Sequence, residues 1–107
     1  MSADDVGRVF AALADPTRRH VVEALLQERS TTVPELTSSL PITRQAVAKH
    51  LSTLDHAGLV ERAPGDGREV HYRLRPGALE AATAWMQDAE SAWDGRLARL
   101  KQAVERR

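Results

Sequence analysis

The stretch VPELTSSLPITRQAVAKHLSTLDHAG, residues 33–58, decides the fold. Pro41 divides it into a short and a longer segment with helical spacing of apolar residues. Each segment follows a good N-cap residue, Thr32 for the first and Thr43 for the second. Gly58 stands where helices commonly end in a left-handed glycine. The stretch therefore predicts two helices joined by a tight turn.

Directly after this stretch the sequence changes from a helical to an alternating pattern. Residues 59–63 and 69–74 are short strand-like runs, and the PGDGR between them, residues 64–68, has the composition of a hairpin loop. Two helices followed at once by a hairpin are the arrangement of a helix-turn-helix, 33–57, with a wing, 59–74. The second helix of such a unit fits the DNA major groove.

Upstream, two further helices are predicted at residues 4–14 and 16–27. The second begins at Asp15-Pro16, a capping carboxylate followed by a proline at the first helical position. On the first helix the apolar residues Val6, Val9, Phe10 and Leu13 recur at helical spacing. The residues expected on the buried side of the second helix are Val21, Val22, Leu25 and Leu26.

Downstream, one long helix is predicted over residues 78–106. Its apolar residues step by three or four, and roughly 28 residues would extend roughly 40 Å, more than a small domain needs for its own core. We therefore expect part of this apolar stripe to be free to meet a second chain. The fold class is mainly α with a small β-hairpin, in the order α-α-α-α-β-β-α, and the expected dimer-interface residues are Val6, Phe10, Met86, Ala89, Trp93, Leu97 and Leu100.

The composition fits one domain spanning residues 1–107. With no cysteine, disulfides, thiolate catalysis and thiolate metal sites are excluded, and the chain is compatible with a reducing cytoplasm. No apolar run is long enough to span a membrane and no signal peptide is evident, so we expect no membrane partner.

The formal net charge of zero conceals an uneven distribution. Residues 1–41 carry four cations and six anions, whereas residues 42–75 carry six cations and four anions. The polar N-terminal half of the second helix of the pair, with Arg44, Gln45 and Lys49, suits base reading, because Arg can bond guanine and Gln can bond adenine bidentately. The chain is therefore expected to contact DNA in the grooves rather than to coat it through bulk charge.

The chain resembles the ArsR-type winged helix-turn-helix transcriptional repressors. The resemblance rests on ALADPTRRHVVEALL (12–26), TVPELTSSLPITRQAVAKHLSTLDHAGLVER (32–62) and GREVHYRL (67–74), and covers roughly residues 8–100. The last helix, with WMQDAESAWDGRLARL (85–100), is most similar to the metal-independent autorepressor branch. The resemblance implies a bacterial, cytoplasmic homodimer that pairs through its first and last helices and represses from a palindromic operator.

The resemblance also implies which residues contact DNA. Ala48 stands where many relatives have Ser, so one hydroxyl contact is expected to be missing. The expected contacts are Thr43, Arg44, Gln45, Ala48, Lys49 and His50 on the recognition helix, Arg62 beside the wing, and a wing tip of Gly65, Asp66, Gly67 and Arg68.

Neither family metal site is expected here. Thr37 and Ser39 occupy the positions of the paired cysteines, and residues 76–107 contain no histidine for the site on the last helix. We expect no cofactor and no metal; an unidentified small-molecule or protein effector stays open. Trp85, Met86 and Trp93 either line a small-ligand pocket near the dimer interface or pack in the dimer core.

The alternative function is a winged-helix module for protein–protein interaction, with the recognition helix as a docking face. In that case replacing Arg44 and Lys49 with alanine would leave function intact. No arrangement of residues supports an enzyme: Ser38, Ser39 and His50 lack an acidic partner at a recognisable spacing, and PGDGR lacks the strand–loop–helix context of a phosphate loop.

Overall fold

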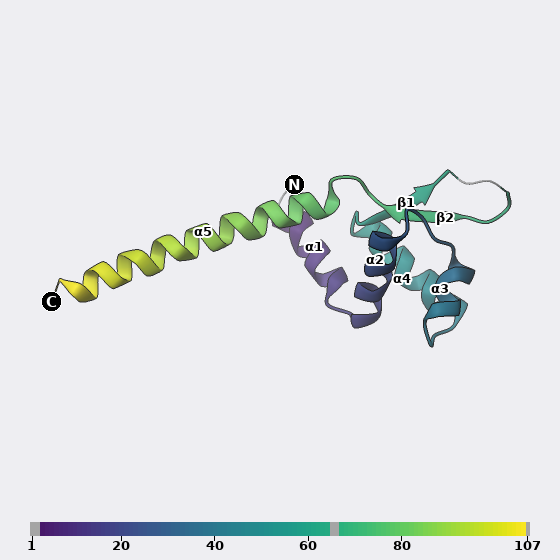
Figure 1. Ribbon diagram of the computed structural model, residues 1–107, viewed down its shortest axis with the longest axis horizontal. Coiled ribbons are helices and arrows are strands. Elements are labelled where there is room, and N and C mark those ends of the chain that lie inside the picture. Colours follow the sequence, from purple (N-terminus) through teal and green to yellow (C-terminus); the bar gives the residue numbers. More distant parts are fainter. Residues whose placement is uncertain (1–2, 65–66, 107) are drawn as a thin grey trace.

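The computed structural model describes residues 3–64 and 67–106. It shows five helices and a two-stranded antiparallel hairpin in the predicted order (Figure 1). A body made by the first four helices and the hairpin lies at one end of the molecule, and the last helix leaves it as a straight arm. The elements are α1 (Ala3–Leu13), α2 (Pro16–Gln27), α3 (Val33–Ser39), α4 (Arg44–His56), β1 (Val60–Ala63), β2 (His71–Leu74) and α5 (Ala78–Glu105).

The helix starts follow from local capping, as predicted. Asp15 caps α2 with Pro16 at its first position, and the Thr43 hydroxyl accepts a hydrogen bond from the Ala46 N–H at 3.1 Å. The Thr32 hydroxyl accepts the Glu35 N–H at 3.2 Å, while the Glu35 carboxylate accepts a hydrogen bond from the neighbouring Thr31 hydroxyl. Capping by short polar side chains thus fixes where three of the helices begin.

The helix-turn-helix consists of α3 and α4, which pack against each other. Pro41 lies in the turn, and the Ile42 N–H donates to the Leu40 carbonyl across it. At the other end of α4, Gly58 has φ +79°, so it ends the helix in the left-handed conformation that glycine adopts without strain.

The wing is the β1–β2 hairpin, with Val60 paired to Leu74 and Ala63 to His71. A third segment, not predicted from the sequence, extends this sheet by one residue. Thr31 forms an antiparallel bridge with Tyr72, in which each N–H donates to the other's carbonyl at 2.9 and 2.8 Å. The bridge ties the α2–α3 connection to the base of the wing.

One apolar core lies between α1, α2, α3, α4 and the hairpin. The prediction that Leu26 faces this core is wrong, because its side chain is 61% exposed. It lies next to the buried Leu25 but one helical step further round, where the core no longer covers it. The buried core residues are Val9, Ala12, Val21, Val22, Leu25, Leu36, Val47, Leu51, Leu54, Leu59, Val60, Ala78 and Ala82.

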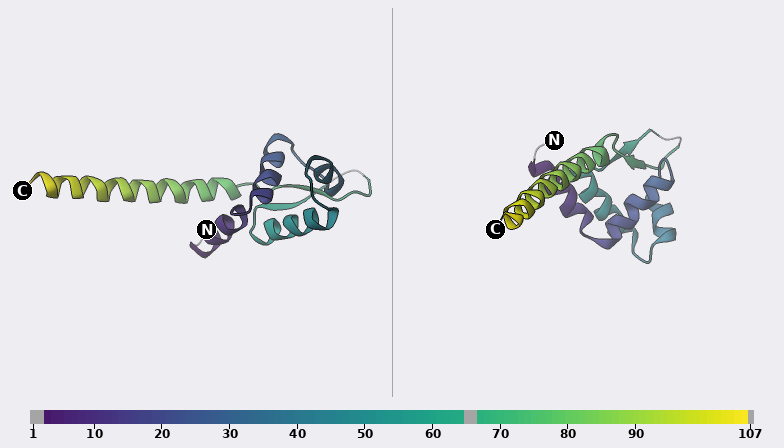
Figure 2. Two further views of the ribbon diagram at one scale, coloured as in Figure 1. Left: turned by 90° about the horizontal axis from the view of Figure 1, so that it is seen from below. Right: turned by 60° about the vertical axis from the view of Figure 1, so that its left-hand side comes forward.

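Helix α5 has 28 residues, as predicted, and only Ala78 and Ala82 on it are buried. Two further views show it projecting from the body without returning to it (Figure 2). The molecule measures 69 × 26 × 23 Å, and α5 accounts for most of the long dimension. Over the described residues, no helix combines the length and apolarity that a membrane span requires.

Candidate nucleic-acid interface

Helix α4 has one face in the core and one in solvent. Val47, Leu51 and Leu54 are buried on the first face. The other face is exposed over the N-terminal half of the helix, where Thr43 forms the cap. The exposed residues there are Thr43, Arg44, Gln45, Ala48 and Lys49. Five of the six recognition-helix positions expected to contact DNA therefore share one solvent-facing surface.

His50, the sixth position, is placed differently. It is half-buried, and its charge acts on Asp15 at the start of α2. The backbone N–H of Arg18 is the main cause that lowers the pKa of the Asp15 carboxyl. Burial opposes it and is second in size, while the Thr17 N–H and then the charges of Arg18 and His50 lower the pKa further. His50 is therefore less available to DNA than the other five positions.

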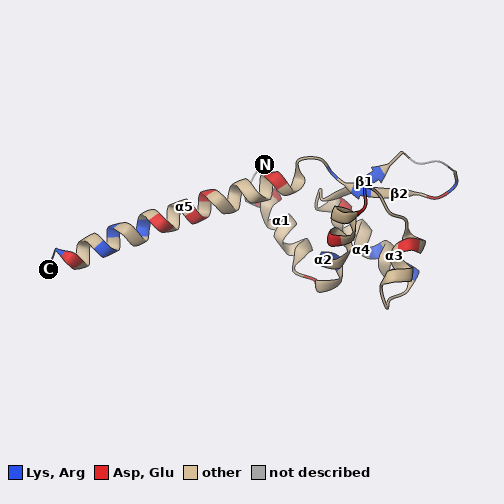
Figure 3. Cartoon of the chain, in the orientation of Figure 1, with Lys and Arg blue, Asp and Glu red and all other residues tan. Residues whose placement is uncertain are grey.

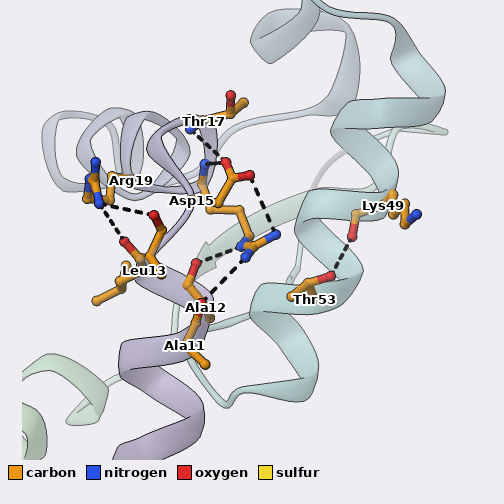
Figure 4. A network of polar contacts seen from close by, with 10 residues as sticks. Ala11, Ala12, Leu13, Asp15, Thr17, Arg19, Lys49 and Thr53 are labelled. Atoms are coloured by element: carbon orange, nitrogen blue, oxygen red, sulfur yellow. Dashed lines mark hydrogen bonds and ion pairs between the residues drawn. The ribbon is translucent and has the colours of Figure 1, made fainter.

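The corner between α1 and α2 gives a structural role to the two arginines of the sequence LADPTRR, residues 13–19, beside the N-cap already expected at Asp15. The Arg18 Nε donates to the Ala12 carbonyl at 2.6 Å, and Arg19 donates to the Leu13 carbonyl at 3.0 Å. The two arginines thus satisfy carbonyls at the end of α1 that have no partner within the helix, while Asp15 caps α2 (Figure 4). The motif therefore fixes α1 against α2 in the body that also contains α4.

The wing cations fall into two groups. Arg73 binds Glu61 at 3.0 Å, directly across the β-ladder, and Arg75 lies 3.8 Å from Glu61 and 3.7 Å from Asp55 at the end of α4. Arg73 thus joins the two strands of the wing, and Arg75 links the wing to the end of α4. Arg73 Nε is also buried, with no hydrogen-bond partner among the described residues.

The other four cations of residues 42–75 remain available. Arg44 and Lys49 on α4 and Arg62 and Arg68 on the wing are exposed, and none forms an ion pair with a residue that the structure describes. Figure 3 shows blue segments on α4 and on both sides of the hairpin. Of the expected wing tip, Gly67 has φ +89°, and Gly65 and Asp66 lie outside the described residues.

The expected dimer-interface residues differ in how much of their surface is available to a partner. Val6 is 2% exposed within the single chain, so it belongs to the chain's own core and has almost no surface left for a partner. Phe10 is half-buried and makes an edge-on contact with Trp85, with ring centroids 5.6 Å apart. Ala89 is half-buried, whereas Met86, Trp93, Leu97 and Leu100 are all exposed on α5.

The three residues of the suggested ligand pocket do not enclose one cavity. A hollow of about 250 Å³ between α1 and α5 is lined by Trp85 but by neither Met86 nor Trp93. The Trp93 ring instead carries the Arg96 guanidinium at 5.6 Å from its centroid. A pocket formed jointly by these three side chains is therefore not present in the single chain.

The two positions of the family's cysteine site carry hydroxyls that serve their own helix. Thr37 Oγ1 donates to the Val33 carbonyl at 2.8 Å, and Ser39 Oγ donates to the Leu36 carbonyl at 3.1 Å. Within the described part of the chain, no group of three His, Asp or Glu side chains is placed to hold a metal ion.

An exposed polar face on the second helix of a helix-turn-helix, beside a hairpin with unpaired cations, defines a winged helix-turn-helix DNA-binding protein. Residues 13–63 match the helix-turn-helix domain family. The transcriptional regulator Rv2034 of Mycobacterium tuberculosis is 38% identical over 98 residues, which cover 92% of this chain and 87% of that protein.

Two solved structures extend the likeness to the whole fold. An ArsR-like transcriptional regulator from Rhodococcus sp. RHA1 has a TM-score of 0.81 and 38% identity, over 92% of both chains. The homodimeric winged helix-turn-helix DNA-binding domain of Mb0332 from Mycobacterium bovis has a TM-score of 0.66 and 25% identity, over 82% of this chain and 80% of that one. The chain belongs to the ArsR-type winged helix-turn-helix transcriptional regulators. It is therefore a DNA-binding regulator and not an enzyme.

Proposed function

We propose that the protein is a homodimeric repressor that binds a palindromic operator, including one at its own promoter, in the bacterial cytoplasm. The observation that carries the proposal is the surface formed by Arg44, Gln45, Lys49, Arg62 and Arg68. Its side chains are exposed and its cations have no ion-pair partner among the described residues. Such a surface has both base-reading groups and phosphate-binding charges.

The roles within this surface follow from chemistry and position. Arg44 and Gln45, in the first turn of α4, are the base readers, since these side chains bond guanine and adenine bidentately. Thr43 and the N–H groups of the first turn suit a phosphate. Arg62 and Arg68 suit the phosphates beside the groove, and Ala48 offers a methyl group for contact with thymine.

The exposed apolar residues of α5 support the homodimer. Trp93, Leu97, Leu100 and Val104 are 55–63% exposed and recur at helical spacing along the projecting arm. Such a stripe on a soluble protein marks a surface that another chain covers. The homodimeric state of the Mycobacterium bovis neighbour supports the same assembly.

The charges on α5 support an antiparallel pairing of the two arms. The acidic residues Glu80, Asp88, Glu90 and Asp94 precede the basic residues Arg96, Arg99, Lys101 and Arg106, with Glu105 as the exception (Figure 3). Only an antiparallel pair places the acidic half of each helix beside the basic half of the other. A two-fold axis near Gly95 would do this for both copies at once.

We further propose that release from DNA does not use a metal bound by the helix-turn-helix. The hydroxyls of Thr37 and Ser39 support this, because both are engaged with carbonyls of their own turn and neither is a thiolate.

The test is a titration of the protein's own promoter fragment, followed by footprinting and by transcription in vitro. We expect a protected dyad-symmetric site and lower transcript levels. The Arg44→Ala/Lys49→Ala variant should lose specific binding. A control, Arg8→Ala/Arg29→Ala, removes two exposed cations that lie outside both the DNA-facing surface and α5, and it should retain specific binding. Equal binding by both double variants would instead favour the protein–protein module.

A further inference from the structure

A hollow of about 290 Å³ lies away from the DNA-facing surface, at the corner where α1, α2 and α4 meet. Figure 4 shows this corner, with Ala11 and Ala12 of α1 on one side and Thr53 of α4 on the other. Its lining residues are Arg8, Ala11, Ala12, Arg18, Thr53, His56 and Ala57. Its volume is at the lower end of the range for small-molecule sites, roughly 300–1,000 Å³.

The floor of the hollow is apolar. Three of its seven lining residues are alanines, Ala11 and Ala12 from α1 and Ala57 from the end of α4. Their small side chains leave the space that larger residues would fill. A compact hydrocarbon body is therefore the group that fits this floor, because its burial removes apolar surface from water on both sides.

The rim is basic. Arg8, Arg18 and His56 line the hollow, and none of the described residues that line it is Asp or Glu. The Arg18 guanidinium is held in place by the Ala12 carbonyl at 2.6 Å and lies 4.0 Å from the Asp15 carboxylate, so it positions the rim while Arg8 and His56 are the groups open to a ligand. Arg8 pairs with Asp5 at 3.2 Å across an exposed surface, which is a weak interaction that a ligand can replace.

One ring nitrogen of His56 is engaged by its own helix. Its Nδ1 lies 2.7 Å from the Ser52 carbonyl, so Nδ1 carries a proton and donates it there. The ring is thereby fixed, and Nε2 is left for a second partner. A protonated Nε2 donates to an anion, as do the two guanidinium groups.

We propose that this hollow binds a small organic anion, a carboxylate carried on a compact apolar body such as an aromatic ring. The carboxylate would lie at Arg8 and His56, and the apolar body on the three alanines. The site is not part of the DNA-facing surface, and it joins the end of the recognition helix to α1.

The position gives the site a regulatory use, which rests on the proposed function. Thr53, His56 and Ala57 belong to the same helix as the base-reading residues, and Thr53 Oγ1 donates to the carbonyl of Lys49 at 3.1 Å. A ligand that binds the free and the operator-bound protein unequally changes operator affinity by the same factor. A small organic anion bound at this corner would therefore change the affinity of the recognition helix for the operator.

The test needs no DNA, so its failure is distinguishable from failure of the proposed function. Benzoate is titrated into the ¹⁵N-labelled full chain, and backbone amide shifts are followed by NMR. We expect saturable shifts of Ala11, Thr53 and Ala57 with a dissociation constant in the millimolar range or tighter. Benzyl alcohol, with the ring but no charge, and sulfate, with charge but no ring, should each bind at least tenfold more weakly.

Three variants separate a built site from general attraction of an anion. Ala11→Leu fills the hollow and should abolish the saturable shifts, while its own spectrum verifies the fold. Arg8→Gln should weaken benzoate binding by about threefold to tenfold. Arg29→Gln removes another exposed charge, just beyond the C-terminal end of α2, and should leave binding unchanged.

Three results would overturn the proposal. The first is shifts that rise linearly without saturation, or that cluster away from the corner. The second is equal binding of benzyl alcohol. The third is retention of the saturable shifts by Ala11→Leu.

Discussion

The division of the wing arginines into paired and unpaired groups predicts how salt affects DNA binding. Each phosphate that a protein cation neutralises contributes about −0.9 to the slope of log affinity against log salt on B-DNA. Arg62→Gln removes an exposed cation without an ion pair among the described residues, whereas Arg75→Gln removes one held between Asp55 and Glu61. Both variants lower the net charge by one per chain, so they form a matched pair.

The magnitude follows from the structure. Arg44, Lys49, Arg62 and Arg68 give four available cations per chain and eight per dimer, so the steepest slope is about −7. Arg62→Gln removes one per chain and should flatten the slope by about 2. A fourfold rise in salt would then weaken wild-type binding roughly 10⁴-fold and the variant's binding roughly 10³-fold. Arg75→Gln should leave the slope unchanged.

The assay is fluorescence anisotropy of a labelled promoter fragment, at five or more salt concentrations between about 50 and 200 mM. The stability of each variant is measured first. The Arg75 ion pairs are half-exposed and near 4 Å long, so their loss should alter the free energy of unfolding by no more than about 1 kcal/mol. Equal slope changes in the two variants, or a larger change in Arg75→Gln, would refute the division.

Three further predictions concern the caps, the left-handed turn and the arm. Asp15→Asn keeps an N-cap but removes a carboxyl whose pKa is lowered by folding. In urea denaturation the wild type should therefore lose more stability than the variant as pH falls from about 6 to about 3, and parallel losses would contradict this. Gly58→Ala should lower the free energy of unfolding by about 1 kcal/mol because φ is +79°, and an unchanged free energy would show that the turn relaxes. Gly7→Ala, at an exposed position within α1, should instead raise the free energy of unfolding. Leu97→Asp should convert dimer to monomer in sedimentation velocity, and an unchanged dimer would place the interface elsewhere.

The helix order was predictable because its signals are local. The caps Thr32, Thr43 and Asp15 and the glycine at 58 each depend on a few neighbouring residues, and all four act in the structure as the sequence indicates. The Thr31–Tyr72 bridge could not be foreseen, because a single residue has no alternation to read. The exposure of Leu26 is a further miss, since the width of the buried stripe on α2 depends on what packs against it.

The candidate site was predictable in composition but not in pairing. Sequence alone counted Arg73 and Arg75 among the six cations of residues 42–75 but could not show that they are paired, because their ion pairs join residues 12 and more positions apart. The effect of the His50 charge on Asp15 likewise joins residues 35 positions apart. Tertiary contacts decide which charges remain available, and no local pattern contains that information.

The unsupported arm also links the amount of this protein to its degradation. A single helix without tertiary packing is marginal in water, and most of α5 beyond Ala82 is exposed on all sides. We expect far-UV helicity to rise with protein concentration as arms find partners. Because proteases cleave frayed segments, we expect limited proteolysis to remove the C-terminal arm faster at low protein concentration than at high concentration. The lifetime of the C-terminal helix would then depend on the concentration of this regulator.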